Sequence, residues 1–119
     1  MLFRSLLKAV NYDQGFSTVE YVSSALVDLA FHNEPLTKNP MQKQKEVLDR
    51  IKMPAEITMR HATPHFAHIF SGDGYSSGYY SYMWSEVMDA DAFEAFNEIN
   101  DPFSLDIAHS LEKDRKSVV

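Results

Sequence analysis

The sequence predicts an all-α fold, and three observations support this prediction. Apolar residues make up 45% of the 119 positions, a fraction typical of a globular chain. The four glycines and five prolines leave long stretches that a helix can occupy without interruption. The alternation of apolar and polar residues that marks strands is weak along the whole chain. We therefore expect helices joined by loops, in one segment covering residues 1–119.

The first two helices are expected within residues 2–31. Residues 2–10 place their apolar side chains on one side of a short helix. These side chains are Leu2, Phe3, Leu6, Leu7 and Val10. The stretch Ser17-Thr-Val-Glu20 has the spacing of a capping box and predicts a second helix from Ser17 to about Phe31. Apolar residues cover more than half of its circumference, so we expect several partners to bury it.

A third helix is expected from Asn39 to Ile51. Asn39 can cap it, and Pro40 suits its first turn because proline lacks an amide donor that this turn leaves unused. The apolar residues of this helix should face the core, namely Val47, Leu48 and Ile51. Its charged residues should face water, namely Lys43, Lys45, Glu46, Asp49 and Arg50.

Residues 52–111 are expected to form a long ordered loop and two further helices. Prolines and glycines interrupt every periodic pattern between Lys52 and Gly74, and loops of that length in a compact domain are usually functional or disordered. A helix should run from about Ser76 through Met88 and continue after a break near residues 89–91. Ser104 can cap a last helix that runs through Leu111.

The composition excludes several classes of function. A formal net charge of −6 speaks against nucleic-acid binding, because no basic stripe is present to neutralise phosphates. Without cysteine, the chain forms no disulfide and has no thiolate chemistry. No apolar run approaches the roughly 20 residues that span a bilayer, and the first residues are too short and too charged for a secretory signal. A cytoplasmic protein without nucleic-acid or membrane partners is expected.

Residues 61–86 concentrate three histidines, three glycines, four tyrosines and a tryptophan. This density favours a glycine-hinged loop that presents polar aromatic side chains to a ligand, followed by an anchoring helix. On that helix one face would carry Tyr75, Tyr79, Tyr82 and Glu86. The opposite face should be core, namely Tyr80, Met83, Trp84 and Val87. Buried tyrosines with satisfied hydroxyls are the plainer interpretation, but the adjacent glycines favour a site that a ligand backbone approaches.

The histidines do not form a convincing metal motif. His61 and His65 have the spacing of a helical zinc-ligand pair, but Ala62 stands where that motif carries its glutamate. Pro64 also disfavours the helix that the motif needs. We expect structural roles for His61 and His65 and assign no metal ligand. A loop site that adds His68 as a third ligand stays an alternative, which stoichiometric metal in the purified protein would support.

Two stretches resemble the thimet oligopeptidase and peptidyl-dipeptidase family of zinc metallopeptidases. The first is Phe66-Ala-His68-Ile-Phe-Ser-Gly-Asp-Gly-Tyr75-Ser-Ser-Gly-Tyr-Tyr-Ser-Tyr82-Met-Trp-Ser-Glu-Val. The second is Asn11-Tyr-Asp-Gln-Gly-Phe-Ser-Thr-Val-Glu-Tyr-Val-Ser-Ser-Ala-Leu-Val-Asp-Leu-Ala-Phe-His32. The resemblance covers about residues 1–100, and it is closest to the bacterial peptidyl-dipeptidases. It implies the C-terminal helical segment of a larger zinc-peptidase catalytic domain, with a long ordered Gly/Tyr loop.

The resemblance also implies roles for individual residues. In this family a His-Glu-x-x-His helix and a downstream glutamate bind zinc, and the glutamate of the motif activates the metal-bound water. This chain contains no His-Glu-x-x-His, so zinc is expected in the full-length family and not in this segment. By motif position, His68, Tyr75 and Tyr82 would bind the substrate backbone and stabilise the tetrahedral intermediate. Tyr79, Gly72 and Gly74 would be further substrate-binding residues.

The expected function is therefore the substrate-binding and oxyanion-stabilising part of a zinc-dependent peptidyl-dipeptidase, which removes dipeptides from the C-termini of peptides. The absent zinc motif suggests a fragment (a truncated gene, a split reading frame or an expressed piece) without activity of its own. Its expected partners are a peptide substrate and either the missing N-terminal catalytic part or a second copy. The alternative is an autonomous helical peptide-binding or interaction module without metal, which micromolar peptide binding by the isolated chain would support.

Overall fold

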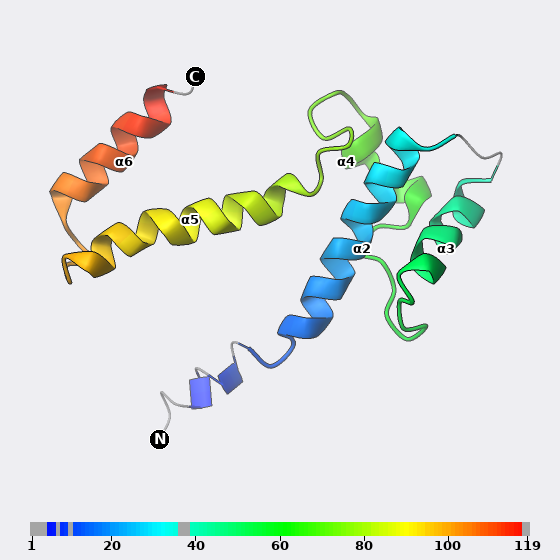
Figure 1. Cartoon of the computed structure of the whole chain (residues 1–119), viewed down its shortest axis with the longest axis horizontal. Helices are drawn as coiled ribbons and strands as arrows, with labels where there is room; N and C mark the ends of the chain where they lie inside the picture. Colours follow the sequence, from blue (N-terminus) through cyan, green and yellow to red (C-terminus); the bar gives the residue numbers. More distant parts are fainter. Residues whose placement is uncertain (1–4, 7, 10, 36–38, 118–119) are drawn as a thin grey trace. The chain divides into compact units, whose positions relative to one another are not determined.

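A computed structural model describes residues 5–6, 8–9, 11–35 and 39–117, with side chains as far as Asp114. Every regular element in these ranges is helical, which confirms the all-α prediction (Figure 1). The chain divides into two compact units, Met1–Tyr80 and Ser81–Val119. Of the helix expected at residues 2–10, Ser5, Leu6, Lys8 and Ala9 are helical. The predicted positions Leu2, Phe3, Leu7 and Val10 lie outside the described residues.

The longest helix of the first unit is α2 (Gln14–Asn33), and it begins three residues before the predicted start. The capping-box prediction is wrong, because Ser17 lies inside the helix and its amide donates to the Asp13 carbonyl at 2.9 Å. Because the preceding turn satisfies that amide, the Glu20 side chain has no N-cap amide to accept from. The Glu20 carboxylate instead meets the Arg60 guanidinium at 3.3 Å.

The centre of α2 is buried, as its broad apolar surface predicted. Its buried residues are Ser23, Ser24, Ala25, Val27, Asp28 and Ala30. The two serines are tolerated there because their hydroxyls donate to the Glu20 carbonyl at 2.9 and 3.1 Å. The helix therefore carries polar groups into the core, Asp28 among them.

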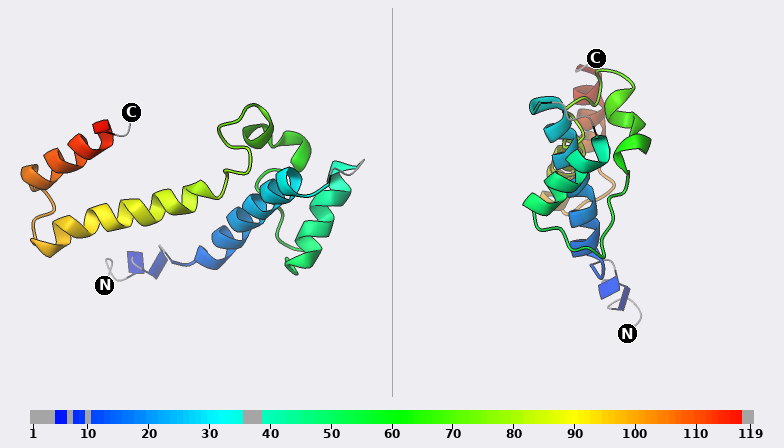
Figure 2. Two further views of the ribbon diagram at one scale, coloured as in Figure 1. Left: turned by 45° about the horizontal axis from the view of Figure 1, so that its top comes forward. Right: turned by 90° about the vertical axis from the view of Figure 1, so that its right-hand side faces the viewer.

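Helix α3 (Pro40–Arg50) lies beside α2, as Figure 1 and Figure 2 show. The predicted cap is confirmed, because the Asn39 side-chain oxygen accepts from the amides of Met41 and Gln42 at 3.0 and 3.2 Å. Val47 is buried as predicted. Two other assignments are wrong: Ile51 follows the helix and is exposed, and Lys43 is only 6% exposed. Lys43 is buried because it pairs with the Glu34 carboxylate just after α2.

The long loop after α3 is ordered and contains two short helical turns, η1 (Thr63–His65) and α4 (Ala67–Phe70). Gln44 ties η1 to α3, because its side-chain oxygen accepts from the amide and the hydroxyl of Thr63, both at 2.8 Å. Phe66 and Ile69 each expose only 1% of their surface and complete the core. The core comprises Ala25, Val27, Ala30, Val47, Met59, Phe66, Ile69 and Tyr79.

The second unit consists of α5 (Ser81–Glu98) and α6 (Leu105–Ser117). Two predictions for α5 are wrong. The helix begins at Ser81 rather than near Ser76, and it passes through residues 89–91 without a break. It ends where Asn100 adopts a left-handed conformation (φ 54°) and the Asp101 amide donates to the Phe96 carbonyl at 3.1 Å. Ser104 precedes α6 as predicted, but α6 extends past Leu111 to Ser117.

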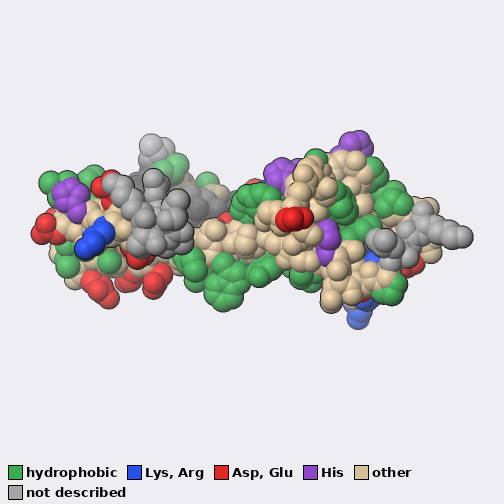
Figure 3. Space-filling model, turned by 90° about the horizontal axis from the view of Figure 1, so that it is seen from above, with side chains coloured by type: hydrophobic (Ala, Val, Ile, Leu, Met, Phe, Trp, Pro, Cys, Tyr) green, Lys and Arg blue, Asp and Glu red, His purple; other side chains and the backbone are tan. Residues whose placement is uncertain are grey.

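The surface of α5 carries many exposed apolar side chains (Figure 3). They are Tyr82, Met83, Trp84, Val87, Met88 and Phe93. The prediction that Tyr80, Met83, Trp84 and Val87 are core residues is therefore wrong for this chain, and Trp84 is 58% exposed. No described residue of α5 is buried, so Met83, Trp84 and Val87 have no packing partner within the described part of this chain that covers them. No helix in the described ranges has the length and apolarity needed to cross a bilayer.

Candidate functional site

A pocket of about 380 Å³ lies between α4 and the glycine-rich turn that follows it. It is lined by Ala67, His68, Ser71, Gly72, Gly74 and Tyr75. The structure thus brings together four of the residues that the sequence singled out, namely His68, Gly72, Gly74 and Tyr75. An ideal Cβ placed on Gly72 or Gly74 would meet no atom within 4 Å, so the backbone at both positions is open to close approach.

Two rings line this pocket, those of His68 and Tyr75, and further rings lie close to His68. The rings of His68 and Tyr75 meet edge to face, with their centroids 5.9 Å apart. His68 also lies 5.7 Å from His61 and 6.3 Å from Tyr79, measured between ring centroids. The imidazole of His61 stacks on Phe66 at 5.1 Å, which fits the structural role expected for it. His68 therefore lies near three other rings while its side chain stays exposed.

The Tyr79 ring lies in the core rather than in the pocket lining. It is 4% exposed, meets Phe66 edge-on at 4.8 Å and stacks with Tyr21 at 5.4 Å. Its main chain is equally constrained, because the Tyr21 hydroxyl donates to the Tyr79 carbonyl at 2.5 Å. Tyr79 thus joins the glycine-rich turn to α2.

The predicted tyrosine stripe does not form, because α5 starts too late. Tyr75 and Tyr79 lie in turns that precede the helix, whereas Tyr82 and Glu86 lie on it. Glycines and serines in residues 71–78 favour turns over helix, which explains the late start. Tyr82 is an exposed residue in the first turn of α5 and belongs to the second unit.

Two residues in the turn between Tyr75 and Tyr79 have special geometry. The Gly78 amide donates to the Tyr75 carbonyl at 2.9 Å, and a Cβ on Gly78 would lie 3.3 Å from the Tyr75 Cα. Ser77 has a positive φ of 58°, a left-handed conformation that costs a non-glycine residue energy. The turn is thus tight, and a side chain at position 78 would crowd Tyr75, whereas one at Gly72 or Gly74 would meet no atom within 4 Å.

Asp28 is a functional candidate that the sequence analysis missed. Its side chain is fully buried, and its two oxygens accept from the amides of Ser77 and Tyr79 at 3.1 and 2.9 Å. His32 Nδ1 lies 2.9 Å from Asp28 Oδ1, one turn along α2. The sequence does contain a sign of this role. Asp28 is the single acidic residue within the apolar stretch Ala25–Ala30, where a buried charge needs hydrogen-bond partners.

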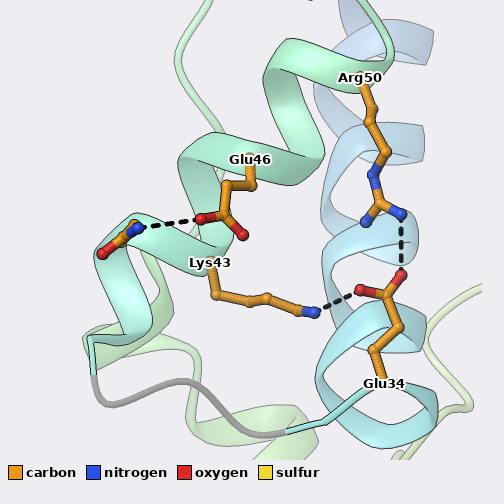
Figure 4. Close-up of polar contacts among 5 residues, drawn as sticks. Glu34, Lys43, Glu46 and Arg50 are labelled. Atoms are coloured by element: carbon orange, nitrogen blue, oxygen red, sulfur yellow. Dashed lines mark hydrogen bonds and ion pairs between the residues drawn. The ribbon is translucent and has the colours of Figure 1, made fainter.

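Ion pairs join α2 to α3 at a second place in the first unit. The Glu34 carboxylate receives Lys43 and also Arg50, whose Nη1 lies 2.9 Å from Glu34 Oε1 (Figure 4). The hydrogen bond from Lys43 and then that from Arg50 lower the pKa of Glu34 below its ordinary value. This cluster joins the C-terminal end of α2 to α3 and includes no residue of the pocket lining.

Comparison of the sequence with known protein families gives a match along almost the whole chain. Residues 1–116 match the profile of peptidase family M3. The chain belongs to peptidase family M3.

Curated relatives of this M3 chain include enzymes from bacteria and plants. Oligopeptidase A of Haemophilus influenzae is 32% identical over 96 residues, which are 78% of this chain and 14% of the relative. Dipeptidyl carboxypeptidase of Escherichia coli is 31% identical over 102 residues, 82% of this chain and 15% of the relative. The "Probable cytosolic oligopeptidase A" of Arabidopsis thaliana is 33% identical over 101 residues, covering 82% and 14%. The M3 chain therefore spans about one seventh of the length of these relatives.

M3 peptidases in general depend on zinc, and the described residues of this M3 chain do not fit that ion. Within those ranges no group of three or more histidine, aspartate or glutamate side chains could hold a metal. His61 precedes η1 and His65 is its last residue, so the two do not share an α-helical face, and the His65 side chain is exposed. We therefore derive no metal chemistry from the residues of this chain.

Proposed function

We propose that this chain is the part of an M3 peptidase that binds the substrate backbone and stabilises the tetrahedral intermediate of peptide hydrolysis. The observation that carries the proposal is the pocket in which His68 and Tyr75 converge beside two glycines. Tyr82 is assigned the same role as Tyr75 from its motif position. Gly72 and Gly74 leave room for a peptide backbone to approach.

The chemistry of these side chains suits the task. A tyrosine hydroxyl has a pKa of about 10, so at neutral pH it keeps its proton and can donate a hydrogen bond. An imidazole can donate as well. Donors fixed where negative charge develops each contribute about 10²–10³ in rate. In this role Tyr75, Tyr82 and His68 stabilise the oxyanion formed when the scissile carbonyl is attacked.

The proposed substrate is a peptide, and the proposed reaction is the removal of dipeptides from its C-terminus. Two relatives support this choice, since their names are oligopeptidase A and dipeptidyl carboxypeptidase. In the complete enzyme, zinc and the group that activates water come from a part outside these 119 residues. The isolated chain is accordingly proposed to be inactive, and the complete enzyme to act in the cytoplasm, as the Arabidopsis relative's name suggests.

A chimera tests the proposal. Residues 1–100 replace the matching segment of Escherichia coli dipeptidyl carboxypeptidase, which is 31% identical over 102 residues. The chimera should hydrolyse peptides, and the chain alone should not. A chimera that folds and retains its zinc but hydrolyses no peptide would contradict the proposal. Specific micromolar binding of peptides by the chain alone, together with an inactive chimera, would instead favour an autonomous peptide-binding module.

A further inference from the structure

We infer that Asp28 is a positioning residue for the pocket. From α2, its carboxylate holds the backbone of Ser77 and Tyr79, and through the turn it fixes where Tyr75 stands relative to His68. The importance of this arrangement for catalysis rests on the function proposed above. The arrangement itself rests on contacts within the first unit.

The Asp28 carboxylate is buried and hydrogen-bonded to the backbone. Asp28 exposes 0% of its surface, so its carboxylate is stable there only if its oxygens are satisfied. Oδ1 accepts from the Ser77 amide at 3.1 Å and Oδ2 accepts from the Tyr79 amide at 2.9 Å. Hydrogen bonds to an ionised acceptor are among the strongest in proteins. The bonds join residues 49 and 51 positions apart, which makes Asp28 a tertiary anchor.

A second side chain on α2 supports the same segment. Tyr21 precedes Asp28 by two helical turns and therefore lies on the same face. Its hydroxyl donates to the Tyr79 carbonyl at 2.5 Å, and its ring stacks on the Tyr79 ring. The amide and the carbonyl of Tyr79 are thus both bonded to α2. This leaves the residue little freedom to shift along the helix.

The tight turn passes this constraint to the pocket. The Gly78 amide bonds the Tyr75 carbonyl at 2.9 Å, and the Gly78 Cα is so close to Tyr75 that a Cβ would lie 3.3 Å from the Tyr75 Cα. Ser77 holds a left-handed φ of 58°, which the bond from its amide to Asp28 stabilises. If that bond is lost, Ser77 relaxes to a negative φ, and Tyr75 moves away from His68.

The experiment compares variants of the 119-residue chain by amide hydrogen exchange. Asp28→Asn keeps the size of the side chain but replaces one acceptor oxygen with a donor, opposite an amide that is also a donor. Protection of the Ser77 and Tyr79 amides should fall at least about tenfold more than protection of the Val47 amide. The NMR signals of the His68 ring should shift as Tyr75 moves, because the two rings are in contact.

A matched control separates positioning from a general loss of stability. Glu34→Gln removes a carboxylate that also joins two elements of this unit, through Lys43 and Arg50. It should leave the His68 signals unchanged and lower the protection of Val47, on the helix that Glu34 joins to α2, more than that of Ser77 and Tyr79. Tyr21→Phe removes only the hydroxyl bonded to the Tyr79 carbonyl. It should loosen Tyr79 in the same direction, and it serves as the test if Asp28→Asn does not fold.

Two outcomes would overturn the inference. One is unchanged protection of Ser77 and Tyr79 in the folded variants. The other is an equal loss of protection at Val47, which would make Asp28 a general stabilising residue. Neither outcome depends on catalysis, so an inactive chimera leaves this test intact. In an active chimera, Asp28→Asn should lower kcat more than it raises KM. A displaced Tyr75 loses a hydrogen bond that it makes mainly in the transition state.

Discussion

The imidazole of His68 meets the ring of Tyr75 edge to face at 5.9 Å, within one pocket lining. This contact places two hydrogen-bond donors of different chemistry beside the open backbone of Gly72 and Gly74. Under the proposed function, both side chains donate to the carbonyl of a bound peptide.

Tyr75→Phe should reduce kcat of the chimera about 10²-fold or more, with a smaller change in KM. The substitution removes one hydroxyl and little volume, and the donor acts mainly in the transition state. Tyr82→Phe should behave in the same way. Steady-state kinetics and thermal unfolding of each variant provide the check. A marked loss of stability with kcat unchanged in both variants would show that the hydroxyls serve packing instead.

Gly72→Ala and Gly74→Ala should weaken peptide binding without weakening the fold. Among the described glycines none has a positive φ, and a Cβ at Gly72 or Gly74 meets no atom within 4 Å. Alanine should therefore raise the free energy of unfolding by about 0.4–1 kcal/mol, while its methyl group raises KM roughly tenfold. Gly78→Ala is the contrasting variant and should lower the free energy of unfolding by about 1 kcal/mol, because its Cβ crowds Tyr75. An unaltered KM in both pocket variants would remove these glycines from the binding site.

Glu34 should make the stability of the first unit depend on acid. Its pKa is lowered in the folded chain by Lys43 and then Arg50. Its contribution is therefore complete above the unfolded-state pKa of about 4.3 and is lost as the pH falls through the lower folded-state pKa. Urea unfolding at neutral pH and below about pH 4 should show a smaller acid-induced loss for Glu34→Gln than for the parent.

The control for this pH experiment is Glu46→Gln. Glu46 lies on the exposed side of α3 and accepts from the Gln42 side chain at 3.0 Å (Figure 4). Its replacement should leave the pH dependence close to that of the parent. An equal change in both variants would mean that the Glu34 cluster has no special part in acid stability.

The chain should associate through α5, either with itself or with the remainder of an M3 enzyme. Large contiguous apolar patches rarely stay bare on a soluble protein, and α5 exposes Met83, Trp84 and Val87 among others. Light scattering should show association that increases with concentration. The double substitution Trp84→Glu and Val87→Glu should reduce it, whereas Tyr12→Ser, an exposed aromatic of the first unit, should not. A well-folded monomer at high concentration would contradict this prediction.

The purified chain should hold no stoichiometric zinc. The described residues offer no group of three suitable side chains, and Pro64 lies between His61 and His65. Elemental analysis after purification without chelator gives the measurement. About one tightly held zinc per chain, lost in His61→Ala, would reverse the assignment and indicate a histidine site in the loop.

Features set by neighbouring residues were predictable from the sequence. The Asn39 cap of α3 depends on amides two and three residues away, and the structure has it as predicted. The start of α2 was predicted three residues too late. The capping-box pattern Ser17–Glu20 can also occur inside a helix that has already begun. In the stretch rich in glycine and tyrosine, the structure brings His68 and Tyr75 into one pocket lining, while their roles stay a prediction.

Features set by distant residues were not predictable in the same way. The burial of Lys43 depends on its ion pair with Glu34. The burial of Asp28 depends on hydrogen bonds from amides about fifty residues away. Helical periodicity assigns a charged residue to solvent unless its partner is known. The exposure of α5 has a related cause, because an apolar pattern predicts burial without saying which chain provides the cover.

Trp84 is the only tryptophan of the chain, and it stands exposed on α5. Its intrinsic fluorescence therefore reports on this helix alone. In the separate chain the emission should be that of an indole in water and open to quenching by iodide. When α5 becomes covered, the emission should move to shorter wavelength and quenching should weaken. The fluorescence of Trp84 thus reports directly on the binding of another protein surface to α5.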